Sequence, residues 1–488
     1  MSPNLRELIN ALAALATGAL AGFVLADARG GTWGFVASPG QIERWQASVP
    51  DSVAIGIALA IPACALIAYK GSRRLAWISI VVLALIVTGL TISRADGATI
   101  DFAIAVQYVR AGAAGLILGC VTAAVWGRIS GQLAVAIGTL SAYLLARAWI
   151  KSGDLAAAAA QFGDPPRTLM FVAIALAVAA AVTAQSAYRL QRLDATTIRW
   201  AVAAAIAFVV VNRLLFSWIT DQPLDSRFGT WVVIGISIAV VLVLVDLLAR
   251  AVSRPNGQFL LVATAVAAGA TLVLNDIRQA YLTVDTWWIV IVGIVAVAVG
   301  LRISVLWKHP IAGLGVVAVV PLVAAIWPGF GTDGPLLVVR VAIVALGAAH
   351  ALGSTFAVDS AFATFGLAIP YAATVFTVAA AGPPRYVIEG TTSYKGSYEP
   401  LIGVPASQEV TQELSAGITL RLQARGDSTS MDGEMIIGRG VSLPRQPATL
   451  DDHLGPVAML LAIAFCVVGI VTLPKSRQPE TPATPDEA

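Results

Sequence analysis

The sequence predicts an all-α polytopic membrane protein with about 14 transmembrane helices and a small extracytoplasmic β-hairpin segment. Two observations support this fold class. The 488 residues are 58% hydrophobic and only 12% charged, with a mean hydropathy of +0.82, whereas soluble domains carry roughly 25% charged residues. Apolar runs long enough to cross a bilayer also recur along the whole chain, and this leaves too little polar surface for a water-soluble body.

Several function classes are not favoured by the composition. The net charge of +3 is too small to indicate nucleic-acid binding. Three cysteines in apolar runs (Cys64, Cys120 and Cys466) form neither a disulfide framework nor a CxxC pattern. The three histidines are scattered, and phosphate-loop, HExxH and GxSxG motifs are absent from the sequence. We therefore expect no metal, no cofactor and no enzymatic activity.

The apolar runs divide the chain into spans, because a hydrocarbon core about 30 Å thick needs about 20 helical residues. The first run is interpreted as a membrane span and not as a removed signal peptide, since more spans follow. The expected spans are 9–27, 52–69, 75–93, 103–126, 131–150, 168–186, 200–218, 228–249, 258–275, 284–305, 310–327, 335–353, 356–380 and 455–473.

Charge distribution predicts the orientation of these spans. With the N-terminus inside, the inner face, termini included, receives fourteen of the 31 Lys and Arg and the short outer loops receive seven. Lysine and arginine resist translocation, so both termini are expected in the cytoplasm. The Ala- and Val-rich, Lys-poor usage indicates a bacterial plasma membrane as the location.

A polar segment at 381–454 interrupts the apolar pattern and is expected on the outer face. In this segment Gly417–Ala424 and part of Gly433–Leu443 alternate apolar and polar residues, which predicts a β-hairpin with the Gly-Asp turn between them. The Pro-rich tail at 475–488 is expected to be disordered.

The inner turn "AYKGSRRLAW" joins the second and third spans. It resembles the loop signature of the major facilitator superfamily, in which the loop controls the rocking of two helical halves. Gly71 matches the second glycine of that motif, and Arg73 and Arg74 match its terminal arginines. The resemblance implies that these three residues are conformational-loop residues, although the first glycine and the acid of the motif are replaced here.

Two further features carry the same resemblance. The fourth span has Arg110 followed by Gly112, Gly115 and Gly119, and small residues at such spacing let helices approach closely. Fourteen spans with a long outer segment before the last one are similar to the fourteen-span drug:proton antiporter branch. The resemblance implies a six-span bundle at 1–199, two additional spans at 200–254, five spans of a second bundle at 255–380, the polar segment at 381–454, the last span at 455–474 and the tail at 475–488.

The sequence departs from that branch at two places. The Gly-Pro-x-x-Gly-Gly signature of the fifth span, which marks antiport in the family, has no counterpart in "LAVAIGTLSAYLLARAW". Asp27 is an imperfect counterpart of the acid in the first span, since it stands close to the outer interface. Drug:proton exchange is thereby placed in doubt.

Ionisable residues at membrane depth are functional candidates, because a charge in hydrocarbon is costly unless it is paired or hydrated. We expect Arg110 and Arg213 to line a central cavity, and Asp359, a few residues into its span, to exchange protons or pair with an arginine. Asp27 is a further candidate for the cavity. Arg340, Asp276 and Arg278 lie near an interface and are interpreted as structural.

Three functions remain open on the sequence. The first is a secondary transporter that works by alternating access and exports an amphipathic or lipid-like compound. The second is a facilitator-like scaffold without transport, which binds an envelope protein through 381–454. The third is a glycosyltransferase using a lipid-linked sugar, for which the first outer loop offers only Glu43 and Asp51. Membrane lipids and a small amphipathic substrate are the expected partners, and nucleic acid is not.

Overall fold

The computed structural model describes most of the apolar part of the chain. The described residues are 3–26, 39–92, 100–151, 165–184, 194–221, 227–279, 286–382, 410–414, 418–422 and 450–474. Candidate residue Asp27, the 433–443 part of the expected hairpin and the tail at 475–488 lie outside them.

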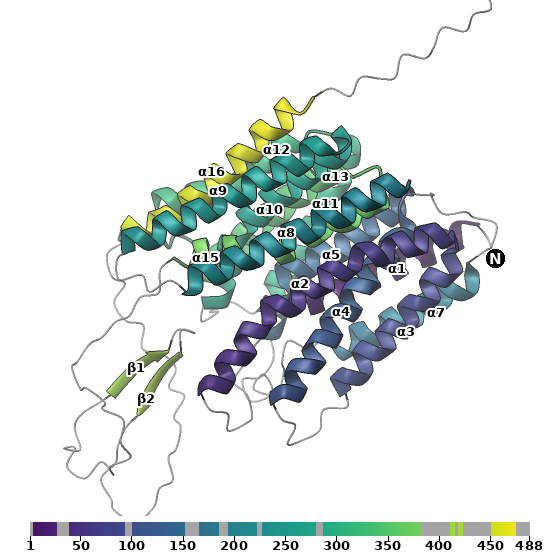
Figure 1. The fold of residues 1–488 in the computed structure, drawn as a ribbon, viewed down its shortest axis with the longest axis horizontal. Helices are drawn as coiled ribbons and strands as arrows, with labels where there is room; N and C mark the ends of the chain where they lie inside the picture. The colour runs from purple at the N-terminus through teal and green to yellow at the C-terminus, as the bar shows by residue number, and fades with distance from the viewer. Residues whose placement is uncertain are drawn as a thin grey trace, which may run out of the picture.

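Fifteen α-helices form the described body (Figure 1). Their bounds are α1 (Pro3–Leu25), α2 (Pro39–Lys70), α3 (Arg73–Ile92), α4 (Ile100–Val125), α5 (Ile129–Lys151), α7 (Arg167–Thr183), α8 (Ala195–Asp221), α9 (Arg227–Ala251), α10 (Arg254–Gln279), α11 (Thr286–Leu306), α12 (Pro310–Ile326), α13 (Gly334–Ser354), α14 (Ser360–Ala372), α15 (Thr374–Ala381) and α16 (Leu450–Thr472).

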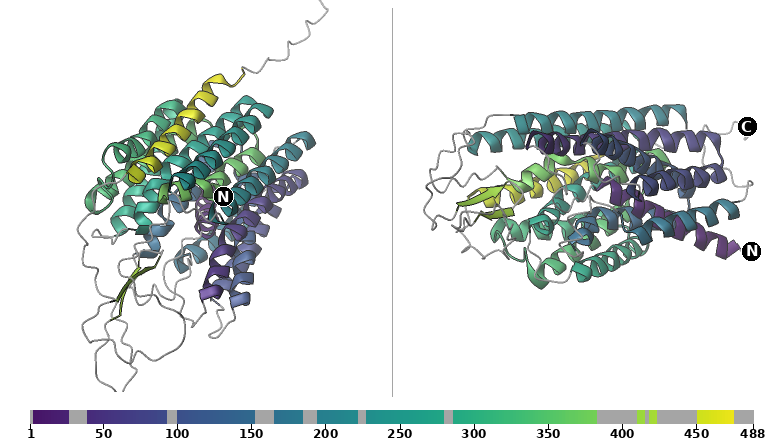
Figure 2. Two further views of the ribbon diagram at one scale, coloured as in Figure 1. Left: turned by 60° about the vertical axis from the view of Figure 1, so that its left-hand side comes forward. Right: turned by 90° about the horizontal axis from the view of Figure 1, so that it is seen from below.

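These helices have the length and surface of membrane spans. Twelve runs in the described part are long and apolar enough to cross a bilayer, with α14 and α15 forming one run, and α7 and α12 are shorter apolar helices of 17 residues. The helices lie side by side with roughly parallel axes (Figure 2). The chain is thus an all-α polytopic membrane protein, and the exact number of spans stays a prediction.

The outward faces of the helices are apolar. On α9 the exposed residues recur every three or four positions along one stripe: Val232, Ile236, Val240, Val243 and Leu247. Such a stripe would be exposed to water in a soluble protein, but it matches hydrocarbon in a bilayer. Exposed tryptophans lie near helix ends, where amphipathic rings favour the membrane interface: Trp200, Trp218, Trp287, Trp288, Trp307 and Trp327.

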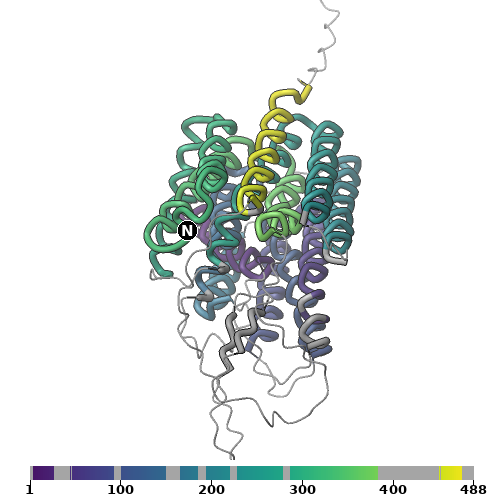
Figure 3. The backbone as a smooth tube through the Cα atoms, turned by 90° about the vertical axis from the view of Figure 1, so that its left-hand side faces the viewer, coloured from purple at the N-terminus to yellow at the C-terminus, as the bar shows by residue number. Residues whose placement is uncertain are grey.

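The helices pack in two groups with matching neighbours (Figures 1 and 3). In the first group α1 contacts α4, α5 and α7, α2 contacts α4, and α3 contacts α4 and α7. In the second group α10 contacts α13, α14 and α16, α11 contacts α13, and α12 contacts α13 and α16. If α1–α5 and α7 are matched in order with α10–α13, α14/α15 and α16, each of these six contacts has its counterpart. The contacts of α10 with α12 and of α4 with α5 are not matched to the same extent.

The remaining helices, α8 and α9, lie beside the two groups. Helix α8 packs on α2 and α14, and α9 packs on α10 and α16. Since α8 begins at Ala195, the expected domain boundary at 199 falls inside this helix and not before it.

Helices α2 and α4 are in backbone contact. A Cβ atom on Gly115 would overlap with the carbonyl oxygen of Gly56, and one on Gly119 would overlap with that of Ala60. A larger side chain at either glycine would push the helices apart, so the small residues of α4 permit this approach.

Two short strands lie in the polar segment. Strand β1 (Val410–Leu414) pairs antiparallel with β2 (Ile418–Leu422), and Val410 is opposite Leu422. Strand β2 falls within the alternating stretch Gly417–Ala424, but its partner precedes it in the chain, whereas the sequence suggested a partner that follows.

Candidate functional site

The contact between the two helix groups is the candidate site, because ligand sites often lie between helices of bundles and between the halves of a structure. Helix α5 lies along α11, and α2 lies along α14. The end of the bundle where the short turns α2–α3, α4–α5, α11–α12 and α13–α14 lie is called the basic end, since Lys70, Arg73, Arg74, Arg128 and Lys308 cluster in them. Side chains join the groups in three layers between this end and the opposite end.

The basic-end layer consists of Trp126, Phe356 and Ala357. Trp126 follows the last residue of α4, and its indole Nε1–H donates a 2.9 Å hydrogen bond to the carbonyl oxygen of Ala357 in the α13–α14 turn. The rings of Trp126 and Phe356 meet edge to face, with centroids 5.6 Å apart and an interplanar angle of 76°. This geometry is favourable for aromatic pairs.

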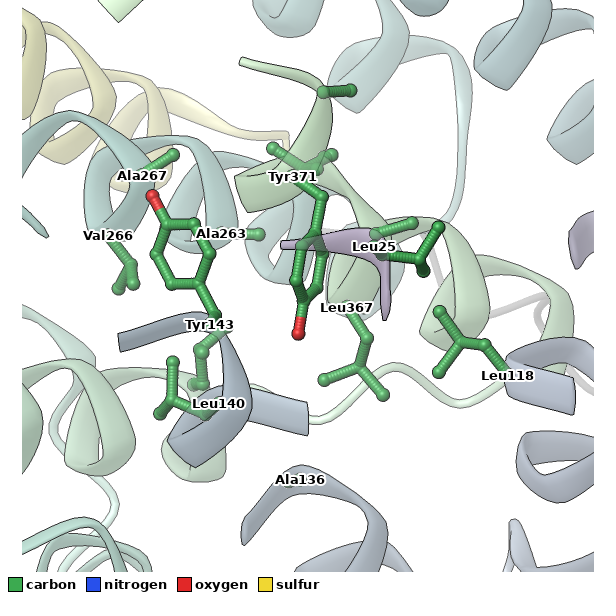
Figure 4. Close-up of a cluster of buried hydrophobic side chains, with 14 of the residues drawn as sticks. Leu25, Leu118, Ala136, Leu140, Tyr143, Ala263, Val266, Ala267, Leu367 and Tyr371 are labelled. Carbon is green, nitrogen blue, oxygen red and sulfur yellow. The ribbon is translucent and has the colours of Figure 1, made fainter. Parts of the chain in front are cut away.

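The middle layer consists of Thr139, Tyr143 and Tyr371, and Figure 4 shows the two tyrosines. The Tyr371 hydroxyl on α14 donates a 2.6 Å hydrogen bond to the Thr139 carbonyl oxygen on α5. The Tyr143 and Tyr371 rings also meet edge to face, with centroids 5.3 Å apart. Both rings are buried, and Tyr143 extends toward Ala267 of α10 (Figure 4).

The opposite-end layer consists of Trp149 on α5 and Trp287 on α11. Their ring centroids are 4.6 Å apart with an interplanar angle of 81°. About one turn earlier on α5, the Leu145 side chain packs against Gly293 of α11, where an added Cβ would come within 2.5 Å of it. The two groups therefore touch near both ends and at mid-depth.

The named residues of the three layers offer aromatic faces, hydroxyls and amide groups, and none of them carries a formal charge. Aromatic rings bury a large apolar area, and tyrosine adds a polar handle at the ring edge. Such a surface suits a ligand with an apolar body and few polar atoms.

The candidate loop residues lie in the α2–α3 turn. Gly71 has φ of +66°, a left-handed conformation that favours glycine. Ser72 then accepts a hydrogen bond from the backbone N–H of Leu75 and caps α3. Arg73 is buried and Arg74 is exposed, so the two arginines of the motif occupy different environments.

Arg110 is buried in α4, on the helix whose glycines contact α2. Arg213 lies on α8, outside both groups, where its guanidinium forms an ion pair with Asp51 of α2 and lies 5.6 Å from the centroid of the Phe216 ring. The pair is about one-third exposed. The contacts that Arg213 makes thus attach α8 to the first group.

The expectation that Asp359 lies within its span is wrong. Asp359 precedes α14 as its N-cap, with extended backbone at φ −93° and ψ 134°. Buried Asn256 of α10 fixes this turn: its Nδ2 donates a 2.7 Å hydrogen bond to the Asp359 carboxylate, and its Oδ1 accepts from the Val358 N–H at 3.0 Å. The apolar residues before Asp359 extended the hydrophobic run without extending the helix.

Arg340 and Asp276 form a second ion pair between helices. Arg340 Nη1 lies 2.8 Å from Asp276 Oδ2, and the two side chains are only 10% and 17% exposed. The pair joins α13 to α10 near the opposite end of the second group. Sequence reasoning treated both residues as snorkelling to the interface and did not pair them.

Comparison of the sequence with models of protein families and with curated proteins finds no match.

Proposed function

We propose that this chain is a secondary transporter of the facilitator type, whose two helix groups rock about their common contact and export an amphipathic or lipid-like compound. The proposal assigns no catalytic step and no cofactor. It places the basic end in the cytoplasm of a bacterial cell and the polar segment with β1 and β2 outside. The matched packing of the two helix groups is the observation that carries it.

Alternating access commonly proceeds by rocking of two repeated helix bundles against each other around a fixed site. Six helix–helix contacts of the first group have a counterpart in the second, and the contact between the groups is made by side chains of a few helices. Small residues pack helices tightly within the first group, while aromatic pairs join the two groups at three depths. We infer that each group moves as a unit and that the aromatic layers separate.

Repeated sequence supports a duplicated architecture. Val-Leu-x-Asp-x-Arg stands at 24–29 and again at 273–278. Val-Arg stands at 109–110 in α4 and at 339–340 in α13, which are matched helices. This arrangement agrees with the resemblance to the major facilitator superfamily carried by Gly71, Arg73 and Arg74.

The substrate class follows from the uncharged layers. A charged ligand would need a fixed opposite charge in the contact to replace its hydration. The residues that join the groups supply aromatic faces and tyrosine hydroxyls instead. An apolar compound with a small polar part is the ligand that such a contact accommodates at least cost.

Transport into liposomes tests the proposal. Purified protein is reconstituted and assayed with an amphipathic fluorescent dye and with a phospholipid carrying a short fluorescent acyl chain. The internal control is a Trp149→Cys/Trp287→Cys variant, in which a disulfide would fasten the opposite ends of the groups. In this variant we expect transport of a probe to stop on oxidation and to return on reduction. In a Trp149→Cys/Trp307→Cys variant, whose cysteines lie at different ends of the bundle, oxidation should not change the transport rate. Equal probe movement in the oxidised and reduced forms would contradict the proposal.

A scaffold without transport is the second candidate, because the groups touch in all three layers and such contacts also suit a rigid body. In that case the polar segment would bind an envelope protein. Deletion of 383–449 should then abolish capture of the partner while membrane insertion persists, and neither probe should cross the reconstituted membrane.

A further inference from the structure

We infer that the contact between Trp126 and Phe356 closes the basic end of the proposed transporter. Asn256 is a positioning residue in this closure, because it holds the α13–α14 turn that carries Phe356. The inference rests on the proposed function. It names the residues that must separate when the pathway opens toward the basic end.

The contact joins positions that correspond in the two groups. Trp126 stands sixteen residues after Arg110, and Phe356 stands sixteen residues after Arg340. Each aromatic residue lies just beyond the end of its helix, α4 or α13, and these two helices are matched in the packing. The indole of one group therefore meets the corresponding ring of the other.

Residues at corresponding positions of a two-fold repeat meet only near the axis that relates the two halves. Tilting of the halves about mid-depth separates such a contact at one end while the other end closes. The basic-end layer cannot keep a 2.9 Å hydrogen bond and an edge-to-face ring pair at 5.6 Å while the groups part there.

Asn256 holds the α13–α14 turn from the side of α10. Its amide makes hydrogen bonds to the Asp359 carboxylate and to the Val358 N–H, next to the Ala357 carbonyl that accepts from Trp126. Phe259, one turn further along α10, lies against the Phe356 ring at 6.3 Å. Helix α10 thus presents both the ring and the carbonyl to the indole.

A native cysteine, Cys64, can report whether this contact is closed or open. Cys64 of α2 is fully buried, and its thiol lies close to the side chains of Ser360 and Thr364 in the first turns of α14, which packs on α2. Its position is therefore at the contact between the two groups, six residues before the basic end of α2. Parting of the groups at the basic end would expose this thiol to water.

The test measures the rate at which a membrane-impermeant maleimide labels Cys64 in purified protein, with Cys120 and Cys466 replaced by serine. Trp126→Ala should raise the rate about tenfold, because a hydrogen bond and an aromatic pair are lost together. Trp126→Phe keeps a ring and loses the donor, so its rate should lie between. Asn256→Ala should also raise the rate. Trp327→Ala, on an exposed tryptophan beyond the opposite end of α12, is the matched control and should not.

Cys64 labelling at the parent rate in both Trp126→Ala and Asn256→Ala would overturn the inference. If Trp126→Ala is not monodisperse, Trp126→Phe and Asn256→Ala decide by the same criterion. The labelling experiment needs no substrate, so it tests the closure by Trp126 and Phe356 independently of the proposed transport. Raised labelling in a protein that moves no probe would leave the closure intact and refute transport, whereas probe transport with unchanged labelling would refute only the closure.

Discussion

The Tyr371 hydroxyl donates a 2.6 Å hydrogen bond to the Thr139 carbonyl oxygen, and so joins α14 of one helix group to α5 of the other. Both partners are buried. We expect Tyr371→Phe to destabilise the purified protein by about 1 kcal/mol, the usual net contribution of one such bond. A thermal unfolding series in detergent measures the loss. Tyr69→Phe, on a tyrosine that is 78% exposed, should leave the unfolding temperature unchanged.

Backbone contact between α2 and α4 predicts a strong effect of one methyl group. Gly115→Ala places a Cβ on the carbonyl oxygen of Gly56, and overpacking of this kind costs about 1–3 kcal/mol. Gly89→Ala adds the same group on α3 where nothing lies within 4 Å. We expect the first variant to lose thermal stability and the second to keep it or gain slightly. Equal stability of both would contradict the close approach of the helices.

Because Arg340 and Asp276 form an ion pair, the losses of stability caused by substituting each of them should not add. Asp276→Asn or Arg340→Gln alone leaves an uncompensated charge between α10 and α13, and breaking a buried pair costs about 3–5 kcal/mol. The double variant Asp276→Asn/Arg340→Gln removes both charges and should be more stable than the sum of the two single losses predicts. Unfolding temperatures of the three proteins test this, with Arg44→Gln as a control because Arg44 and Asp101 pair at 67% and 72% exposure. Additive losses would show that the charges do not interact.

Orientation is tested by two cysteines placed at opposite ends of α2. Lys70→Cys lies at the basic end and Ala47→Cys near the other end, and both positions are exposed. With the native cysteines replaced, an impermeant maleimide added to intact cells should label Ala47→Cys and spare Lys70→Cys. The reverse pattern would place the basic turns outside.

The membrane helices were predictable from the sequence because each of them corresponds to a long run of apolar residues. Helix α9 consists almost entirely of such residues, and its exposed stripe has the same composition as its buried face. The same uniformity hides helix ends. Phe356, Ala357 and Val358 continue the apolar pattern, so the sequence placed Asp359 inside a span, although Asn256 holds it in a turn.

The contacts between the groups were not predictable in this way. Trp126 and Ala357 are 231 positions apart, and hydrophobic periodicity reports which face of a helix is buried but not which helix covers it. The repeated spacing from Arg110 to Trp126 and from Arg340 to Phe356 was the available signal. The pairing of Arg213 with Asp51 of α2 was not predictable either, and the expectation that Arg213 lines a cavity stays a prediction.

Distances between spin labels at both ends of the bundle test the central claim most directly. One pair is Leu75→Cys and Leu306→Cys near the basic end, and the other is Ala47→Cys and Asp333→Cys near the opposite end. Each pair joins the first helix group to the second. Two populations are expected for each pair, and conditions that lengthen the first distance should shorten the second. A single unchanged distance at both ends, with and without transport probe and across pH, would contradict a carrier with two rocking halves.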